Sequence, residues 1–237
     1  MARMPSKRYV ILSDIQGDFH DPLALGAALD FTKEYKPDGI ILNGDIVDCP
    51  TLSEFDRNPD DVKGALFREI RFGHKLMEKL EWVESKWWIE GNHEDRVRRL
   101  AWKRGLGAAV NFPSLFGLGT HGFQHHPYGG HIDLGKLMVT HGSMICKYAG
   151  ATALAHIIKY GVSVVIGHTH RLAKVHHTDR NGPHVGIENG CLCMLNPTWV
   201  QHPDWQQGFS VVTVRPDGGF HPDIIPIIKR RSIYYGG

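Results

Sequence analysis

The sequence predicts one α/β domain with a mixed sheet system. Short apolar runs alternate with stretches in which apolar residues recur at helical spacing, which is typical of strands that alternate with helices. Turn signals at Asn181-Gly182 and Asp217-Gly218-Gly219 indicate hairpins near the C-terminus. No internal repeat or clean linker divides the 237 residues, and this length suits a single domain.

The first part of the chain alternates strand and helix patterns. Tyr9–Ser13 is an apolar run that predicts a buried strand. Pro22–Tyr35 predicts a helix, because proline is favoured in the first helical turn. A second strand, a long helix, a third strand and another helix are predicted at Gly39–Asn43, Asp61–Trp82, Lys86–Glu90 and Glu94–Lys103. The long helix rests on the apolar spacing from Leu66 to Leu80.

The segment Gly105–Gly130 interrupts this alternation. It is rich in Gly, Phe, Pro and His, so we expect a loop or a cap insertion, and loops of this length are often functional. His121, His125, His126 and His131 lie in or beside it. Two interpretations stay open for these histidines: a cap that reaches a phosphate or a base, and exposed loop residues.

The second part of the chain resumes the pattern. Leu137–Thr140 and Val162–Ile166 predict strands, and Ala149–Tyr160 predicts a helix between them. The apolar fraction of 42% suits a packed core and excludes bulk disorder. A net charge of +2 gives no electrostatic argument for a dedicated nucleic-acid binder.

The N-terminus and the cysteines predict a cytoplasmic protein without a membrane partner. The apolar run from Tyr9 to Leu12 is too short for the core of a signal peptide, and no stretch approaches membrane-spanning length. None of the cysteines forms a CxxC pair, so zinc ribbons and thioredoxin-type motifs are not indicated. Cys191 and Cys193 would share one face of a strand, and we interpret them as small buried residues of a reduced protein.

Polar side chains follow the apolar runs at the point where each run ends. The residues are Asp14, Gln16, Asp45, Asp48, Asn92, His93, His141, His168 and His170. Because ligand sites form at the carboxyl ends of strands in α/β sheets, we expect these side chains to gather in one crevice. Packing alone does not explain them, since buried charges and imidazoles need partners.

These residue types suit two divalent metal ions of borderline to hard character. Asp45 could bridge both ions. The remaining ligands divide into Asp14, Gln16 and His170 for one ion, and Asn92, His141 and His168 for the other. Two ions roughly 3.5–4 Å apart can clamp the attacking and leaving oxygens of a phosphoryl transfer. Their charge, partly neutralised by carboxylates and one hydroxide, suits an anionic phosphate.

The order of these residues resembles the signature of the calcineurin-like metallophosphoesterases. The usual motifs of that family are DxH, GDxxD, GNH[ED], an isolated His-Gly pair and GHxH. This chain carries, in the same order, Asp14-x-Gln16, Gly44-Asp45-x-x-Asp48, Gly91-Asn92-His93-Glu94, His141-Gly142 and Gly167-His168-x-His170. Each motif alone is weak, but the joint match over residues 14 to 170 is very specific.

The resemblance implies one calcineurin-like phosphoesterase domain over residues 1–237, folded as a four-layer αββα sandwich with mixed β-sheets. It implies hydrolysis of phosphomonoesters or phosphodiesters, including nucleotide-derived ones, by metal-activated hydroxide. It also assigns His93 as the catalytic acid that protonates the leaving oxygen or binds phosphate. Asp48 would orient and charge His93 as a carboxylate–imidazole pair.

Position 16 departs from the family pattern. The family usually has His there, and this chain has Gln16. Because an amide oxygen is a neutral, harder ligand, we expect weaker binding at that ion and a preference for Mn²⁺, with Mg²⁺, Fe and Zn²⁺ as alternatives. The Asp-x-Gln form is known in a branch that includes manganese-dependent ADP-ribose and CDP-alcohol pyrophosphatases and in small phage and bacterial enzymes.

Position 49 is a second departure. Protein serine/threonine phosphatases of the superfamily carry there an Arg that grips phosphate, and this chain has Cys49, which disfavours that activity. Arg96, Arg98 and Arg99 could supply a substitute or could be surface residues of a helix.

Two other functions stay open beside the small-ester hydrolase. A nuclease that acts on DNA or RNA ends would carry a basic, aromatic-lined groove or an added DNA-binding domain. A weakly catalytic metal-binding scaffold would have lost ligands, and here only Gln16 departs from the usual set. Trp199, Trp205 and Phe209 could stack on a base, or could pack in the core or a hairpin.

Overall fold

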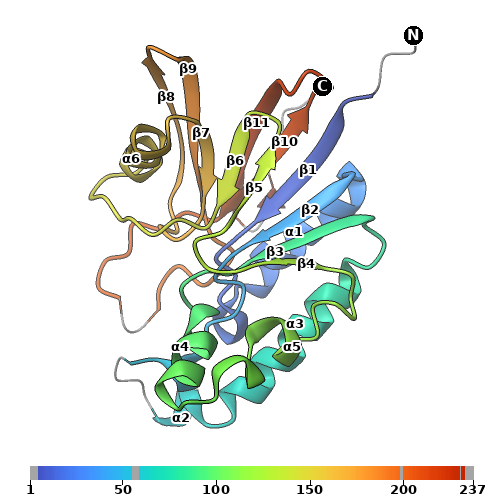
Figure 1. Ribbon diagram of the computed structural model, residues 1–237, viewed down its shortest axis with the longest axis vertical. Coiled ribbons are helices and arrows are strands. Elements are labelled where there is room, and N and C mark those ends of the chain that lie inside the picture. Colours follow the sequence, from blue (N-terminus) through green and yellow to red (C-terminus); the bar gives the residue numbers. More distant parts are fainter. Residues whose placement is uncertain (1–4, 55–58, 198–199, 230, 233–237) are drawn as a thin grey trace.

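The computed structural model describes residues 5–54, 59–197, 200–229 and 231–232. Two β-sheets pack against each other, and helices cover their outer faces (Figure 1). The strands are β1 (Lys7–Leu12), β2 (Gly39–Asn43), β3 (Ser85–Ile89), β4 (Gln124–His126), β5 (His131–Leu134), β6 (Leu137–Thr140), β7 (Ser163–Ile166), β8 (Leu172–Asp179), β9 (Gly182–Asn189), β10 (Gly208–Val214), β11 (Phe220–Ile228) and β12 (Arg231–Ser232). The helices are α1 (Pro22–Tyr35), α2 (Pro59–Val62), α3 (Ala65–Lys79), α4 (Asp95–Lys103), α5 (Phe112–Leu115) and α6 (Ala151–Tyr160), with short 3-10 turns η1 (Gly17–Phe19), η2 (Pro50–Leu52) and η3 (Gly107–Ala109).

Both sheets are mixed. The first has seven strands in the order β12-β11-β10-β1-β2-β3-β4, in which β1 to β4 are parallel and β10 to β12 are antiparallel. The second has five strands in the order β5-β6-β7-β9-β8, with β6, β7 and β9 parallel. The two predicted hairpins are β8–β9 and β10–β11.

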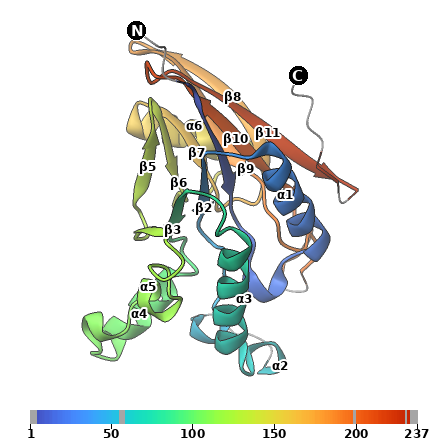
Figure 2. The ribbon, with the colours of Figure 1, turned by 90° about the vertical axis from the view of Figure 1, so that its right-hand side faces the viewer.

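Three apolar clusters define four layers. One lies between the helices α1, α3 and α5 and the outer face of the seven-stranded sheet, and includes Phe31, Leu76 and Trp88. A second lies between the sheets, where residues such as Ile41 and Val165 meet. A third lies between α6 and the five-stranded sheet. Figure 2 shows α1 and α3 on the side of the seven-stranded sheet, and the αββα sandwich predicted by resemblance is confirmed.

The predicted ends of helices and strands agree with the structure where the apolar pattern stops at a residue that begins or ends an element. The helix Pro22–Tyr35 and the strands Gly39–Asn43 and Leu137–Thr140 have the predicted limits. The helix predicted over Asp61–Trp82 is divided into α2 and α3, because Gly64 adopts a left-handed conformation with φ 67° between them.

The segment Gly105–Gly130, expected to be a loop or a cap, takes part in the core. It contains α5 and β4, and β4 pairs in parallel with β3 at the edge of the seven-stranded sheet. Phe112 and Phe116 are buried and stack on each other with ring centroids 4.5 Å apart. The apolar side chains among its glycines therefore serve packing. Within the described part of the chain, none of the helices combines the length and apolarity that crossing a bilayer requires.

Candidate metal centre

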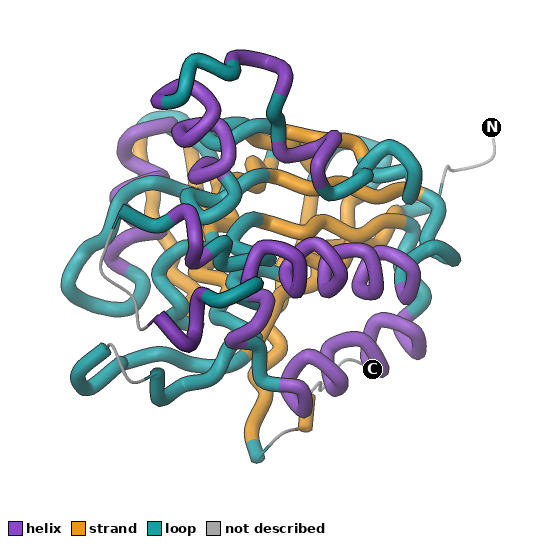
Figure 3. Tube along the Cα trace, turned by 90° about the horizontal axis from the view of Figure 1, so that it is seen from below, coloured by secondary structure: helices purple, strands orange, loops and turns teal. Residues whose placement is uncertain are grey.

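The loops after the parallel strands lie together at one end of both sheets. Figure 3, which looks at the molecule from below, shows loops and helices in front of the strand ends. Five candidate residues adopt left-handed backbone conformations there: Asp14 (φ 53°), Gln16 (φ 62°), Asp45 (φ 52°), His168 (φ 70°) and His170 (φ 58°). Each such conformation costs on the order of 1–3 kcal/mol and persists only where the surrounding structure holds it, as at functional sites.

Three glycines allow these loops to touch. A Cβ atom would lie 2.4 Å from His141 Nδ1 at Gly44, 2.1 Å from Asp45 Oδ1 at Gly91, and 2.7 Å from Asp14 Oδ2 at Gly167. Real Cβ contacts are longer, so glycine is required at all three positions. The motif glycines thus bring the ligand-bearing side chains together.

One group of candidate ligands surrounds Asp14. His170 Nε2 lies 3.2 Å from Asp14 Oδ1, and Gln16 Nε2 lies 3.3 Å from His170 Nε2 and 3.5 Å from Asp45 Oδ2. Both oxygens of Asp14 accept the His168 backbone N–H at 3.1 Å, which orients the carboxylate. Asp14, Asp45 and His170 offer ligand atoms within 4.8 Å of one another, a spacing that suits one ion.

A second group shares Asp45. Asp45, His141 and His168 also offer ligand atoms within 4.8 Å of one another. The His141 Nδ1 atom donates to the Asn43 carbonyl oxygen at 2.8 Å, which fixes the tautomer and leaves Nε2 free to bind a metal. That Nε2 atom faces Asp45 Oδ2 at 3.4 Å.

Unsatisfied buried atoms provide a test of whether the site fits a metal. His141 Nε2 and Asn92 Oδ1 are buried and have no hydrogen-bond partner among the described residues. Leaving such atoms unpaired is costly, and both are good donors to a divalent ion. Asn92 lies in the turn after β3 beside His93, as predicted. The donor set of carboxylate, amide and imidazole therefore fits divalent cations.

The buried carboxylates favour a positive charge on the groups next to them. Burial raises the pKa of Asp45, but His93 and His141 outweigh it and hold that pKa well below its usual value. Burial lowers the pKa of His141, but the adjacent Asp45 raises it to about 9. Asp14 likewise holds the pKa of His170 well above its usual value despite burial. Burial lowers the pKa of His168 to about 4, so this ring is neutral at pH 7, the form in which an imidazole can bind a metal.

His93 stands beside this cluster with its two nitrogens facing different groups. Nδ1 lies 2.6 Å from Asp48 Oδ1, and Nε2 lies 3.6 Å from Asp45 Oδ2. The His93 backbone N–H donates to Asp45 Oδ1 at 3.0 Å and holds the ring at the site. The Asp48 carboxylate at Nδ1 orients the ring so that Nε2 points toward the cluster, which is the geometry a general acid needs.

The three arginines of α4 have different surroundings. Arg96 is largely buried, donates to the Asp48 carbonyl oxygen, and lies 3.2 Å from Asp48 Oδ1. Arg98 instead pairs with Asp95, and the exposed Arg99 pairs with Glu54. The alternative of a phosphate-binding substitute therefore fits Arg96, and that of surface residues fits Arg98 and Arg99.

Two buried glutamates support the site: Glu94, which the sequence placed in a motif without a role, and Glu69, which was not predicted. Glu94 accepts backbone N–H bonds from Asp45 (2.9 Å), Ile46 (2.8 Å) and Gly91 (2.8 Å), and so ties the loops after β2 and β3 together. Glu69 on α3 accepts the Asp48 N–H at 3.0 Å, and burial raises its pKa to about 8. The signal in the sequence that could have identified Glu69 is its position on the buried face of α3.

A cavity of about 240 Å³ opens beside these residues. Its polar side includes Asp48, His93 and Arg96, and its apolar side includes Phe19, Met194 and Trp205. The Trp205 ring packs against His170 with centroids 4.2 Å apart.

The other aromatic residues predicted to stack on a base, and the histidines of the segment 105–130, have different surroundings. Phe209 is buried and packs on Phe31. Trp199 lies outside the described residues. His125 pairs with Glu90. None of the four histidines in or beside the segment 105–130, which the structure describes throughout, lines the cavity.

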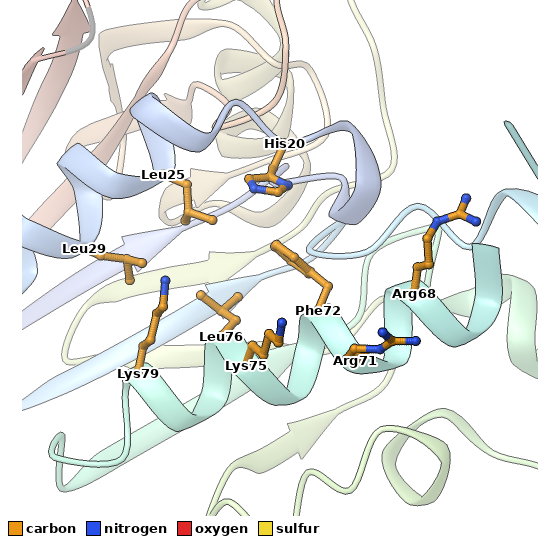
Figure 4. A pocket seen from close by; sticks show the side chains of 9 residues that line it. All are labelled: His20, Leu25, Leu29, Arg68, Arg71, Phe72, Lys75, Leu76 and Lys79. Atoms are coloured by element: carbon orange, nitrogen blue, oxygen red, sulfur yellow. The ribbon is translucent and has the colours of Figure 1, made fainter. Parts of the chain in front are cut away.

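A larger hollow of about 330 Å³ lies between α1 and α3, and none of the candidate ligands lines it (Figure 4). Its apolar lining comes from Leu25, Leu29, Phe72 and Leu76. Arg68, Arg71, Lys75 and Lys79 surround it on α3. Because Gln16, His93 and His170 line the smaller cavity, it is the candidate substrate site.

Comparisons with known proteins identify the family that this chain resembles. The sequence model of the family described as calcineurin-like phosphoesterase matches residues 7–172. The Gene 54 proteins of Mycobacterium phages D29 and L5 are both 26% identical to this chain, and the matches cover 95% of this chain and 96% of each relative.

Solved structures with a similar arrangement include a predicted phosphoesterase of Streptococcus pneumoniae, with a TM-score of 0.44 and 14% identity, covering 98% of this chain and 95% of that one. Another is Vacuolar Protein Sorting 29 of Cryptosporidium parvum, with a TM-score of 0.49 and 12% identity, covering 92% of this chain and 96% of that one.

Proposed function

This chain belongs to the calcineurin-like phosphoesterase family and is a metal-dependent phosphoesterase, and we propose that it hydrolyses small phosphate esters at a dinuclear centre. One observation carries the proposal. The Asp45 carboxylate belongs to two groups of candidate ligand atoms, each within 4.8 Å, which supports a bridging role between two ions. The free cysteines support a location in a reducing cytoplasm as part of the proposal.

The proposed ligands divide as the two groups do. Asp14, Gln16, Asp45 and His170 would hold one ion, and Asp45, Asn92, His141 and His168 would hold the other. The Gln16 amide nitrogen faces His170 at 3.3 Å, and turning the amide by half a rotation presents its oxygen instead. Since oxygen-rich donor sets suit Mn²⁺ and Mg²⁺, we propose Mn²⁺ as the native ion.

The chain's own groups supply the remaining chemistry. When bound, the two ions would polarise the phosphoryl oxygens and lower the pKa of an attacking water. His93, held by Asp48 through Nδ1, is placed to give the proton on Nε2 to the leaving oxygen. Arg96 lines the same cavity, so its remaining N–H donors can bind a phosphoryl oxygen. Arg96 would bind phosphate in place of the arginine that the serine/threonine phosphatases carry at the position of Cys49.

The test uses protein stripped of metal and assayed on bis-p-nitrophenyl phosphate and p-nitrophenyl phosphate with Mn²⁺, Mg²⁺, Zn²⁺ or no added metal. We expect turnover to return with Mn²⁺ and to be lost in Asp45→Asn, together with both ions by metal analysis. The ratio of diester to monoester turnover identifies the ester class. Full activity of Asp45→Asn, or binding of a single ion by the wild-type protein, would contradict the dinuclear proposal.

One observation favours a second candidate, a nuclease. Arg68, Arg71, Lys75 and Lys79 recur at helical spacing along α3, and the hollow beside them contains the ring of Phe72 (Figure 4). A basic stripe with an aromatic side chain suits a phosphate backbone. A single-stranded oligonucleotide that is turned over more efficiently than a small diester, with a loss in Lys75→Glu, would favour the nuclease.

A further inference from the structure

The cavity beside His93 has two walls of different chemistry. One wall carries the ionisable groups Asp48, His93 and Arg96, which would act on the phosphate and on the leaving oxygen. The apolar lining includes Phe19, Met194 and Trp205, and the candidate ligands Gln16 and His170 also line the cavity. An apolar wall of this size directly beside a metal centre is not needed to hold the ions, so it calls for a role in binding.

The apolar wall is built rigidly. Met194 donates its backbone N–H to the Phe19 carbonyl oxygen at 2.9 Å, which joins two segments far apart in sequence. Trp205 is held from both sides: Gln206 N–H donates to the His170 carbonyl oxygen at 2.9 Å, and Asp204 pairs with Arg171 at 2.8 Å. A preformed aromatic surface binds a flat ligand without first losing side-chain entropy.

The position of His93 determines where the leaving group would lie. If His93 Nε2 gives its proton to the leaving oxygen, the alcohol attached to that oxygen must extend away from the ions, into the space that adjoins His93. That space is the 240 Å³ cavity. A flat ring there would contact Trp205 and Met194, whereas a polyol would lose hydration against apolar side chains that replace few of its hydrogen bonds.

We propose that the cavity that Phe19, Met194 and Trp205 line together with His93 is a leaving-group subsite that selects phosphate esters of alcohols bearing a flat aromatic ring. The inference rests on the proposed function, because it requires His93 to act on the leaving oxygen. The ring can belong to an aryl alcohol or to the base of a nucleotide, and both present the same π-face.

The test compares benzyl phosphate with ethyl phosphate on the Mn²⁺-loaded protein, since both are primary alkyl esters. We expect kcat/KM to be higher for benzyl phosphate by roughly 10-fold to 100-fold, the range of one aromatic stack. Trp205→Ala should remove that preference by lowering kcat/KM for benzyl phosphate far more than for ethyl phosphate, and Trp205→Phe should largely retain the preference. Trp82→Ala is the matched control, because Trp82 is 48% exposed and lies outside the cavity.

A second readout does not depend on turnover. Benzylphosphonate, which is not hydrolysed, should bind the wild-type protein more tightly than ethylphosphonate in calorimetry, and Trp205→Ala should abolish the difference. Equal loss for both ligands together with lost metal would assign Trp205 to support of His170 and overturn the subsite. If the phosphonates discriminate but no ester is hydrolysed, the proposed function fails and the ring-binding site stands.

A further comparison identifies the source of the ring. A nucleoside 5′-monophosphate is set against ribose 5-phosphate with wild-type protein and Trp205→Ala. Loss confined to the nucleotide shows that the wall accepts a base, and no loss for either restricts the subsite to aryl alcohols.

Discussion

Replacing Gly91 by alanine tests how the loops of the metal centre are held together. An added Cβ would lie 2.1 Å from Asp45 Oδ1 and 2.4 Å from the Asp45 backbone nitrogen. Ordinary contact begins at 3.4 Å, so the two loops must separate by about 1.3 Å. Asp45 cannot give way cheaply, because Glu94 binds its N–H and His93 N–H binds its carboxylate.

The expected cost follows from this geometry. Overpacking that moves backbone typically costs about 1–3 kcal/mol, and we expect Gly91→Ala at the upper end. Because a metal ligand must lie within about 0.2 Å of its place, a shift of this size at the shared carboxylate should weaken both ions. We expect Mn²⁺ affinity to fall by roughly 10-fold to 100-fold or more.

Urea unfolding and Mn²⁺ titration measure the two effects, with Gly26→Ala as the matched control. Gly26 lies inside α1 with nothing within 4 Å of an added Cβ, so alanine there should stabilise the protein by about 0.5–1 kcal/mol. The two substitutions are chemically identical and should have opposite signs. Wild-type stability and Mn²⁺ stoichiometry in Gly91→Ala would refute the reasoning.

Four further outcomes are expected. His93→Ala should lower turnover by roughly 10²–10⁴-fold at unchanged metal content, and more for alkyl than for p-nitrophenyl esters, since a poor leaving group needs the proton; equal activity would exclude the acid role. Arg96→Ala should lower kcat/KM by about 10-fold or more, whereas Arg99→Ala, which removes an exposed pair, should not. Because the pKa of His141 is about 9 in the metal-free protein, an ion must displace its proton, so Mn²⁺ affinity should fall as pH is lowered below 9; calorimetry in buffers of different ionisation enthalpy counts the protons released. Gln16→His should raise Zn²⁺ affinity relative to Mn²⁺ in competition assays, and an unchanged ratio would remove the argument from amide hardness.

The parts of the fold that the sequence predicted are those encoded locally. The strand before Asp45 is buried throughout, and the strand before Asp14 is apolar and buried from Val10 to Leu12; a run buried on both faces needs no distant information to be recognised. The helix from Pro22 is bounded by proline and by the side chain of Asp21, which accepts the N–H groups of Leu23 and Ala24. The candidate ligands follow from the same local rule, because they stand where apolar runs end.

The segment Gly105–Gly130 shows where that rule stops. Its glycines and prolines indicate a loop, yet β4 exists because β3 offers an open edge and Phe112 has Trp88 to pack against. Strand pairing and aromatic contacts depend on a partner that is distant in sequence. No window of the segment alone contains that information.

The same dependence on distant partners explains why the candidate ligands could be predicted and the residues that surround them could not. The sequence predicted Asp14, Asp45 and His170 as ligands, because polar side chains at successive strand ends are a pattern along the chain, and the structure brings their ligand atoms within 4.8 Å of one another. Glu69, Arg96 and Trp205 acquire their places only when α3, α4 and the loop before β10 converge on one end of the two sheets. The sequence alone determined which metal-binding residues the chain carries. Tertiary packing decided which other side chains surround them, because contacts between distant segments depend on how the layers pack.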